Sequence, residues 1–176
     1  MVAVLKSQDS PTQAEFHEVI AARADRWYAA CLRITRNPDL AEDAVQDALL
    51  SAWNKRHQFE RSARLDTWIH RIAVNAALML IRKAKPATWE PLESEVPDDT
   101  PTPDVIHAIE ALNTNLAEAL NQLTDIERVC FVLKHLEQWR LKEIAQELDT
   151  TVGTIKQALF RAVKKLRVSM ADLRSQ

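Results

Sequence analysis

Apolar residues recur every three or four positions along most of this 176-residue chain. That spacing places them on one face of an α-helix, so the pattern predicts an all-α protein. In the first half of the chain it predicts three helices, over residues 12–34, 38–53 and 67–85. Asn37 is a favourable N-cap for the second of them, and Pro38 suits a first helical position. Residues 56–66 break the period, which indicates a basic loop.

The second half of the chain shows the same periodicity. It predicts helices over residues 105–120, 125–136 and 141–148, and from 152 onward. Thr124 and Glu127 have the spacing of a capping box, in which each side chain accepts a hydrogen bond from the backbone of the other. Asp149 and Thr150 form a turn between the short third helix and a longer fourth one, which Thr151 caps. A short helix, a tight turn and a longer helix with a basic outer face are typical of a helix-turn-helix motif.

The composition excludes several classes of protein. Gly153 is the single glycine of the sequence, where average usage of about 7% predicts roughly twelve. This scarcity excludes the glycine-rich loops of nucleotide-binding α/β folds and most hairpin turns. Cys31 and Cys130 lie in apolar patterns, so we expect both to be buried. The five histidines form no pair at metal-ligand spacing, so the sequence predicts no metal and no other cofactor.

The sequence also predicts where the protein works. Its most apolar stretch, residues 73–81, is too short to cross a bilayer. The amino terminus carries neither a long apolar run nor a small-residue cleavage site, which argues against export. We therefore expect a cytoplasmic protein without direct membrane insertion.

Charge is distributed unevenly, although the net charge is only −2. Residues 1–85 carry +3 (13 basic, 10 acidic), residues 86–127 carry −10 with no basic residue, and residues 128–176 carry +5 (10 basic, 5 acidic). Five of the seven prolines lie at positions 86–103. Since proline removes backbone donors and like charges repel, we expect an extended segment there. It is either a passive spacer or an anionic strand that occupies a basic channel of a partner.

The sequence therefore predicts two helical domains joined by a tether. The boundaries that the pattern indicates are a flexible tail at 1–11, one domain at 12–85, an acidic proline-rich linker at 86–104, and a second domain at 105–176.

The last predicted helix has the chemistry of a helix that reads DNA. If Ile155, Leu159 and Leu166 face the core, the opposite face carries Thr154, Lys156, Gln157, Phe160, Arg161, Lys164 and Lys165. In a major groove its early residues would reach base edges, and its later cations would contact phosphates. The alternative is an ordinary solvated face with Phe160 packed on a neighbouring helix. The absence of acidic residues from Thr151 to Met170 favours DNA.

Two separate blocks of the sequence carry a family resemblance. Residues 37–53 read NPDLAEDAVQDALLSAW, and TWIHRIAVN follows at 67–75. In the second half, LTDIER at 123–128 is followed by EIAQEL at 143–148, VGTIK at 152–156 and LFRA at 159–162. These blocks resemble regions 2 and 4 of the group IV, extracytoplasmic-function (ECF), sigma factors of bacterial RNA polymerase. Their order and acidic connection are similar to those of two-domain members, which lack the middle domain of housekeeping sigma factors.

The resemblance implies three sets of site residues. The set that docks on the clamp helices of the largest polymerase subunit is Asp43, Gln46, Asp47 and Leu50. The set that binds the opened non-template strand of the −10 element is Phe59, Arg61, Arg64, Trp68, Arg71 and Asn75. The set that reads the −35 duplex is Thr154, Lys156, Gln157, Phe160, Arg161 and Lys164. The second domain would also contact the polymerase flap, and the linker would pass through the active-site cleft.

The resemblance further implies an anti-sigma factor that holds the protein inactive. An apolar face around Val74, Leu78 and Met79 is the expected docking surface for it, because Val74 and Met79 stand where the family often has charged residues. At the helix-turn-helix, Asp149 and Thr150 replace a common Gly-hydrophobic turn, and Ala158 replaces a frequent arginine.

Two other classes of protein fit parts of the sequence. A conventional helix-turn-helix regulator with an N-terminal dimerisation domain would bind a palindromic duplex tightly without polymerase, whereas a sigma factor binds isolated duplex weakly. A helical-bundle enzyme would need paired carboxylates with histidines at ligand spacing, and the sequence has none. The favoured hypothesis is a sigma factor, not an enzyme, that directs core polymerase to specific promoters and assists their opening.

Overall fold

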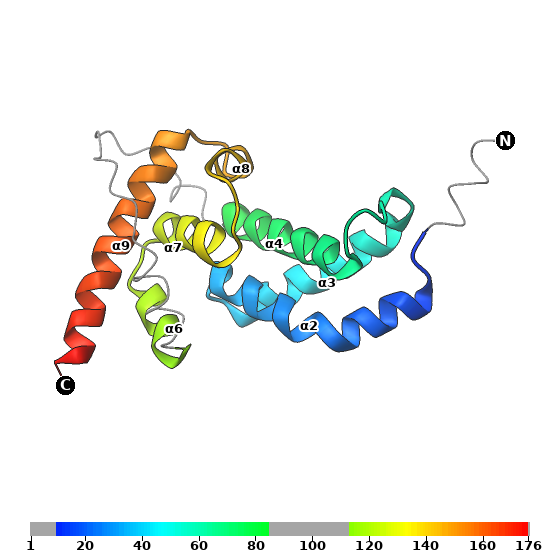
Figure 1. Ribbon diagram of the computed structural model, residues 1–176, viewed down its shortest axis with the longest axis horizontal. Coiled ribbons are helices and arrows are strands. Elements are labelled where there is room, and N and C mark those ends of the chain that lie inside the picture. Colours follow the sequence, from blue (N-terminus) through cyan, green and yellow to red (C-terminus); the bar gives the residue numbers. More distant parts are fainter. Residues whose placement is uncertain (1–9, 85–112, 176) are drawn as a thin grey trace. The chain divides into compact units, whose positions relative to one another are not determined.

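The computed structural model describes residues 10–84 and 113–175, and the chain divides into two compact units, the first of which ends at Ala84 (Figure 1). Every regular element within these ranges is helical, which confirms the all-α prediction for this part of the chain. Most of the expected tail, and the expected linker at 86–104, lie outside the described residues. Among the described helices, none combines the length and apolar character needed to cross a bilayer.

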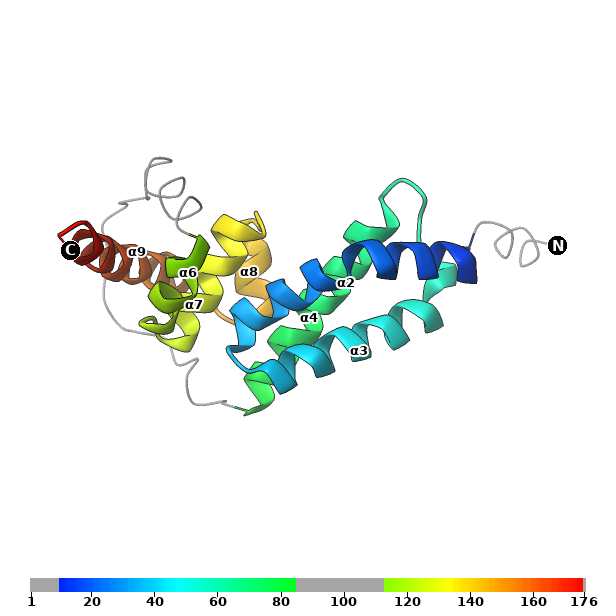
Figure 2. The same cartoon turned by 90° about the horizontal axis from the view of Figure 1, so that it is seen from below.

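Three long helices, each packed against the other two, form the first unit (Figure 2). They are α2 (Gln13–Thr35), α3 (Pro38–Asn54) and α4 (Leu65–Ala84), with a short 3-10 turn (Arg56–Gln58) after α3. The expected cap of α3 is confirmed: Asn37 Oδ1 accepts hydrogen bonds from the backbone N–H groups of Asp39 at 2.9 Å and Leu40 at 3.2 Å. The loop between α3 and α4 is shorter than expected, since the 3-10 turn occupies its start and α4 begins at Leu65.

A stripe of alanines lets α3 approach its neighbours closely. Ala41, Ala44, Ala48 and Ala52 are all buried. Large side chains of the other two helices complete the core, among them Trp27, Ile34, Ile69 and Ile81. Because the alanines take up one face of α3, its polar residues and Leu50 lie on the side that faces solvent.

The second unit contains four described helices: α6 (Asn113–Asn121), α7 (Asp125–Phe131), α8 (Leu141–Glu147) and α9 (Val152–Arg174). The long helix α9 packs against the other three. The predicted capping box of α7 is present: Thr124 N–H donates to Glu127 Oε2 at 3.0 Å, and Glu127 N–H donates to Thr124 Oγ1 at 3.4 Å. Of the helix expected at 105–120, residues 105–112 lie outside the described residues.

The expectation of one regular helix over 125–136 is wrong. The α-helix ends at Phe131, and the chain continues as a π-helical turn (Val132–Leu136). In this wider turn Glu137 N–H donates to the carbonyl of Val132, five residues back, at 2.9 Å. The turn keeps Val132 and Leu133 buried while it redirects the chain toward α8, which a straight α-helix would not do.

The turn between α8 and α9 has the form expected of a helix-turn-helix. Asp149 adopts a left-handed conformation (φ 50°), and its N–H donates to Gln146 O at 3.2 Å. Thr150 N–H donates to Ala145 O at 2.9 Å, which completes a Schellman motif. An aspartate can fill this position without glycine because its short polar side chain tolerates the left-handed region. Thr151 then caps α9, as expected.

Both cysteines are buried, as predicted. Cys31 Sγ–H donates to the carbonyl of Ala73 at 3.4 Å. Burial, together with the nearby charge of Glu127, raises the pKa of the Cys130 thiol to about 12. Because the thiolate is the reactive form, Cys130 is chemically inert in the folded protein.

The alanine stripe generates a stability prediction. We expect Ala48→Leu to lower the free energy of unfolding of the first unit by about 1–3 kcal/mol, because three added carbons have no space between α3 and its neighbours. Chemical denaturation followed by circular dichroism measures this change. Glu42→Leu, on the exposed side of the same helix, is the control and should change stability by less than about 0.5 kcal/mol. Equal losses in the two variants would contradict close packing at Ala48.

Candidate promoter and polymerase interfaces

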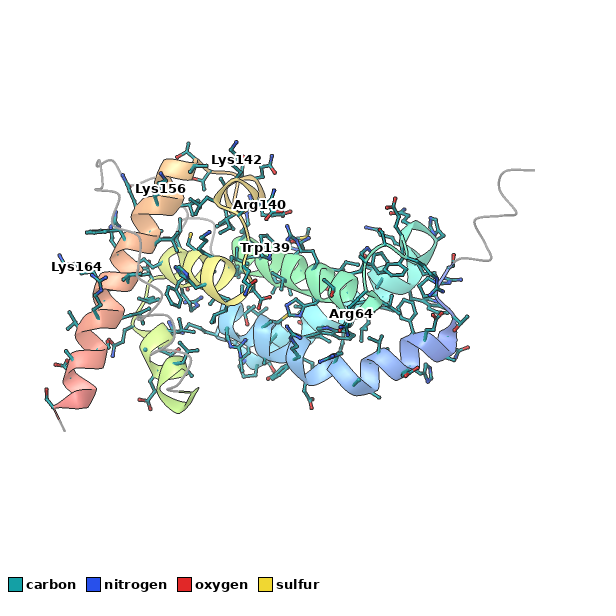
Figure 3. The ribbon with its side chains drawn as sticks, in the orientation of Figure 1. Arg64, Trp139, Arg140, Lys142, Lys156 and Lys164 are labelled. Atoms are coloured by element: carbon teal, nitrogen blue, oxygen red, sulfur yellow. The ribbon has the colours of Figure 1, made fainter. Side chains whose placement is uncertain are left out.

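The outer side of α9 carries most of the residues predicted to read DNA. Lys156 and Lys164 are exposed and point away from α7 (Figure 3). Gln157, Phe160 and Arg161 are half-buried along the same helix. Phe160 thus shares its surface between solvent and the unit's own packing. These five side chains leave α9 with a basic surface that begins in its first turns.

One expectation for this surface is wrong. Thr154 is only 7% exposed: its N–H donates to Thr151 Oγ1 at 3.2 Å, and the two hydroxyls lie 3.0 Å apart. It therefore closes the start of α9 and does not face outward. Lys165 is exposed, as helical periodicity predicts, but its Nζ lies 2.7 Å from Oε2 of the buried Glu127.

The structure adds two cations that sequence reasoning missed. Arg140 and Lys142 lie at the start of α8 and are exposed (Figure 3). Arg140 N–H donates to Glu143 Oε2 at 2.8 Å, so the glutamate that folds back on the helix start is engaged by the backbone. The available signal was two basic residues at the start of the first helix of the helix-turn-helix, Arg140 at its N-cap and Lys142 in its first turn, from which cations can reach a DNA backbone.

In the first unit, Phe59 lies in the loop between the 3-10 turn and α4. Its side chain is 8% exposed and packs against half-buried Trp68, with ring centroids 5.3 Å apart. Phe59 was predicted to bind the −10 strand, but its ring is buried and offers that strand little surface. Trp68 forms the other half of this aromatic contact and keeps part of its surface exposed.

Two arginines of the same loop are held by carboxylates. Arg61 donates two hydrogen bonds to Glu15 on α2, at 2.8 and 3.2 Å. Arg64 donates two hydrogen bonds to Asp66, at 3.1 and 3.2 Å. Asp66 also forms an ion pair with Arg23, whose Nε lies 3.3 Å from Asp66 Oδ2. A groove of about 480 Å³ lies between α2 and the loop, with Val19, Ala22 and Phe59 among its walls.

These ion pairs shift the acidity of both carboxyl groups. The hydrogen bonds from Arg61, with one from the backbone N–H of Thr12, lower the pKa of Glu15 to about 2. Burial raises the pKa of Asp66, but the N–H of Thr67 and the charges of Arg64 and Arg23 outweigh it, so that the net shift is downward. Both carboxylates are therefore ionised at neutral pH and can pair with the arginines of the loop.

Farther along α4, Arg71 and Asn75 are half-buried. The side-chain Oδ1 of Asn75 is buried and has no hydrogen-bond partner within the described parts of the chain. The apolar surface expected beside them is largely absent, because Val74 and Leu78 are buried in the unit's own core. Met79, 70% exposed, is the member of that trio that faces solvent.

The residues predicted to dock on polymerase are all exposed on one side of α3. Asp43, Gln46, Asp47 and Leu50 all lie on the side opposite the alanine stripe, and Leu50 is 65% exposed. Sequence reasoning did not include Trp53, which continues this face. The Arg56 guanidinium lies 4.1 Å from the centre of the Trp53 ring. It also donates a hydrogen bond to the backbone carbonyl of Trp53 at 2.7 Å, so the two contacts hold the indole in place.

Within the described residues, no cluster of three or more histidine, cysteine, aspartate or glutamate side chains could hold a metal ion. The side chains of these surfaces offer charges, amides and aromatic rings. An acidic and apolar helix face, a basic loop over a groove, and a basic helix-turn-helix are separate features suited to macromolecular partners.

Comparison with known proteins explains why these surfaces occur in one chain. Residues 19–87 match sigma-70 region 2, and residues 113–166 match sigma-70 region 4. The chain is 30% identical over 155 residues to RNA polymerase sigma-E factor of Streptomyces coelicolor, covering 87% of this chain and 84% of that protein. The chain belongs to the ECF sigma factors of the sigma-70 family.

Other relatives of the chain are also ECF RNA polymerase sigma factors. ECF RNA polymerase sigma factor SigW of Bacillus subtilis is 29% identical over 180 residues, which cover 96% of each chain. Some relatives are longer, and this chain covers 46–66% of their length. The sigma factor RpoE of Bartonella quintana, solved in complex with the anti-sigma factor NepR, shares the fold with a TM-score of 0.54 at 21% identity, over 89% of this chain and 97% of that one.

Family membership decides between the hypotheses that the sequence left open. As an ECF sigma factor, the protein directs RNA polymerase in transcription initiation and is not itself an enzyme. The region 2 match covers α3, α4 and most of α2, whereas the region 4 match ends within α9 at residue 166. A conventional helix-turn-helix regulator would not account for the region 2 match.

The pairing of Glu15 with Arg61 generates a pH prediction. The pKa of Glu15 is lower in the folded protein than in the unfolded chain, so the stabilisation from this pair is complete above about pH 4.5 and is lost as the pH falls toward 2. We expect Arg61→Gln to raise the pKa of Glu15 toward 4.5, as measured by NMR titration of the side-chain carboxyl. Arg64→Gln, whose partner is Asp66, should leave the Glu15 titration unchanged. A Glu15 titration near 4.5 in the unmodified protein would contradict the ion pair.

Proposed function

We propose that α9 enters the major groove of the −35 element. Lys156 and Gln157 lie in its first turns, where a helix inserted N-terminus first brings side chains to base edges. The side-chain amide of Gln157 has the donor and acceptor needed for adenine, but its Oε1 is buried, so the amide would have to turn outward to use both. Lys156 can donate to guanine. Arg161 and Lys164 follow one and two turns later and would contact phosphates, while Arg140 and Lys142 on α8 would hold the backbone beside them.

The observation that supports this proposal most is the absence of any acidic residue between Thr151 and Met170, alongside five basic ones. A random solvated helix face mixes both signs of charge. A face that is uniformly cationic attracts a polyanion and releases its counterions on binding. The family's region 4 match over the same helices supports the same role.

The loop before α4 would hold the opened −10 strand. Arg61 and Arg64 are exposed and bound to carboxylates through pairs of the surface type, which are worth roughly 0–1 kcal/mol each. Phosphates can therefore displace those carboxylates at little cost. Arg71 and Asn75 would contribute from α4, and the partly exposed ring of Trp68 would offer a surface against which a base can stack.

The exposed face of α3 would bind the clamp helices of the largest polymerase subunit. Asp43 and Asp47 offer charge, Gln46 offers an amide, and Leu50 offers an apolar contact at the centre of the face. Such a mixed surface suits a basic, partly apolar partner helix. The second unit would contact the polymerase flap, and residues 86–104 would pass through the active-site cleft as an anionic strand. Because polymerase and promoter are both inside the cell, the protein would act in the cytoplasm.

An anti-sigma factor would regulate access to these surfaces. The solved relative from Bartonella quintana is bound to the anti-sigma factor NepR, which supports a partner of the same class here. The exposed apolar residues Leu50 and Met79 are the natural anchors for it. A partner that covers Leu50 would also prevent polymerase binding.

Separate variants of the two units test these roles. We expect Lys156→Ala and Arg161→Ala each to weaken initiation that depends on the −35 element, by about 1–3 kcal/mol of binding free energy, and to leave affinity for core polymerase unchanged. Asp47→Asn should weaken polymerase affinity and leave DNA selectivity in the assembled holoenzyme intact. In vitro transcription on fragmented genomic DNA identifies a responsive promoter, and fluorescence titration of core polymerase measures affinity. Loss of polymerase affinity in the α9 variants alone would overturn the assignment.

A further inference from the structure

Lys164 and Lys165 are neighbours on α9 but have different surroundings. Lys164 is exposed on the basic side of the helix. Lys165 is turned about 100° further round the axis, and its Nζ lies 2.7 Å from Oε2 of Glu127 on α7. The lysine side chain is 42% exposed, whereas the glutamate side chain is 2% exposed. The pair therefore connects α7 and α9 through two residues that are 38 positions apart in sequence. The buried member of the pair is the glutamate.

Glu127 accepts two hydrogen bonds on the same oxygen. Its Oε2 receives the backbone N–H of Thr124 at 3.0 Å, as the third residue of the α7 capping box, and the ammonium group of Lys165. A carboxylate this far from water needs such donors, because an uncompensated buried charge is strongly unfavourable. The position of Lys165 is thus tied to the first turn of α7.

The other contacts that α9 makes with its unit are mainly apolar, unlike the Lys165–Glu127 ion pair. The buried face of the helix consists of small and medium apolar side chains, namely Ile155, Ala158, Leu159, Ala162, Val163 and Leu166. This packing sets the broad orientation of the helix, because a large rotation would expose these side chains, but individual apolar contacts are not directional and select less sharply among small rotations. The ion pair is directional. Nearer the C-terminal end, the Ser169 hydroxyl also donates to the side-chain carbonyl of Gln122.

We propose that Lys165 is a positioning residue: through Glu127 it sets the rotation of α9 about its axis, and thereby which side chains of α9 face the DNA. This inference rests on the proposed role of α9 at the −35 element. Lys165 is held away from phosphates, although helical periodicity counts it with the basic face. The DNA-contacting cations of the helix are Lys156, Arg161 and Lys164.

Two measurements on the holoenzyme, formed from the full chain and core polymerase, separate the roles of the neighbouring lysines. One is the slope of log affinity against log salt for a promoter fragment taken from the genomic transcription assay. The other is the ratio of affinities for that fragment and for the same fragment with a scrambled −35 element. We expect Lys164→Ala to reduce the slope by about one and to preserve most of the ratio, because it removes a phosphate contact.

Lys165→Met should give the opposite result. The salt slope stays that of the unmodified protein, and the selectivity ratio falls at least fivefold because small rotations of α9 become less costly without the ion pair. Lys165→Arg, which keeps a donor for Glu127, should restore the ratio to within twofold. A slope reduced by one in Lys165→Met, or a ratio that does not change, would overturn the proposal.

A second variant covers the case in which Lys165→Met fails to fold because Glu127 is left charged and buried. The double variant Glu127→Gln, Lys165→Met removes both charges and should fold, while its selectivity ratio stays at least fivefold below that of the unmodified protein. Full selectivity in a folded double variant would overturn the proposal. If Lys164→Ala and Lys156→Ala also leave the salt slope unchanged, the proposed DNA face of α9 fails instead, which separates that failure from this one.

Discussion

A glutamate shared between a helix N-terminus and a distant cation holds a loop in the first unit and a helix in the second. In the first unit, Glu15 accepts the N–H of Thr12 at 2.7 Å and also binds Arg61, 46 residues away. In the second, Glu127 accepts the N–H of Thr124 and also binds Lys165. Each glutamate is the third residue of a capping box, where its carboxylate is already fixed by the helix it closes. The distant cation therefore binds to an anchor whose conformational entropy has already been lost.

Burial makes the two anchors behave differently. Glu15 lies near the surface, where the hydrogen bonds from Arg61 lower its pKa to about 2. The exposed Arg61 can exchange this carboxylate for another anion with little loss, since solvent screens both states. Glu127 is buried, so removing its lysine leaves a charge without solvation, and exchange is unfavourable. The same arrangement of a capping glutamate and a distant cation therefore holds the loop before α4, which can be released, and the helix α9, which remains fixed.

The features that sequence predicted correctly are local in the chain. Asn37, the Thr124–Glu127 box and the Thr151 cap involve residues two or three positions apart, and the helices follow from periodicity alone. The ion pair of Arg61 joins residues 46 positions apart, and that of Lys165 joins residues 38 positions apart. Helical periodicity and capping motifs do not predict pairs at such a separation. Thr154 and Val74 were assigned to exposed faces but lie at the edges of buried ones, where the side chains of neighbouring helices determine exposure. The π-turn after Phe131 depends on where the chain must go next, which periodicity does not encode.

The distribution of charge along the chain implies unequal contributions of the two units to promoter binding under the proposed roles. The segment of α9 between Thr151 and Met170 carries five basic residues and no acidic one, so contact with phosphates would release counterions and add affinity. In the first unit, Arg61 and Arg64 already have carboxylate partners, and binding a strand replaces one anion by another. That exchange adds little net affinity, but it requires the phosphates to occupy the positions that the carboxylates held. Duplex binding by the second unit therefore supplies most of the electrostatic free energy, and the loop of the first unit contributes chiefly to the choice of strand geometry.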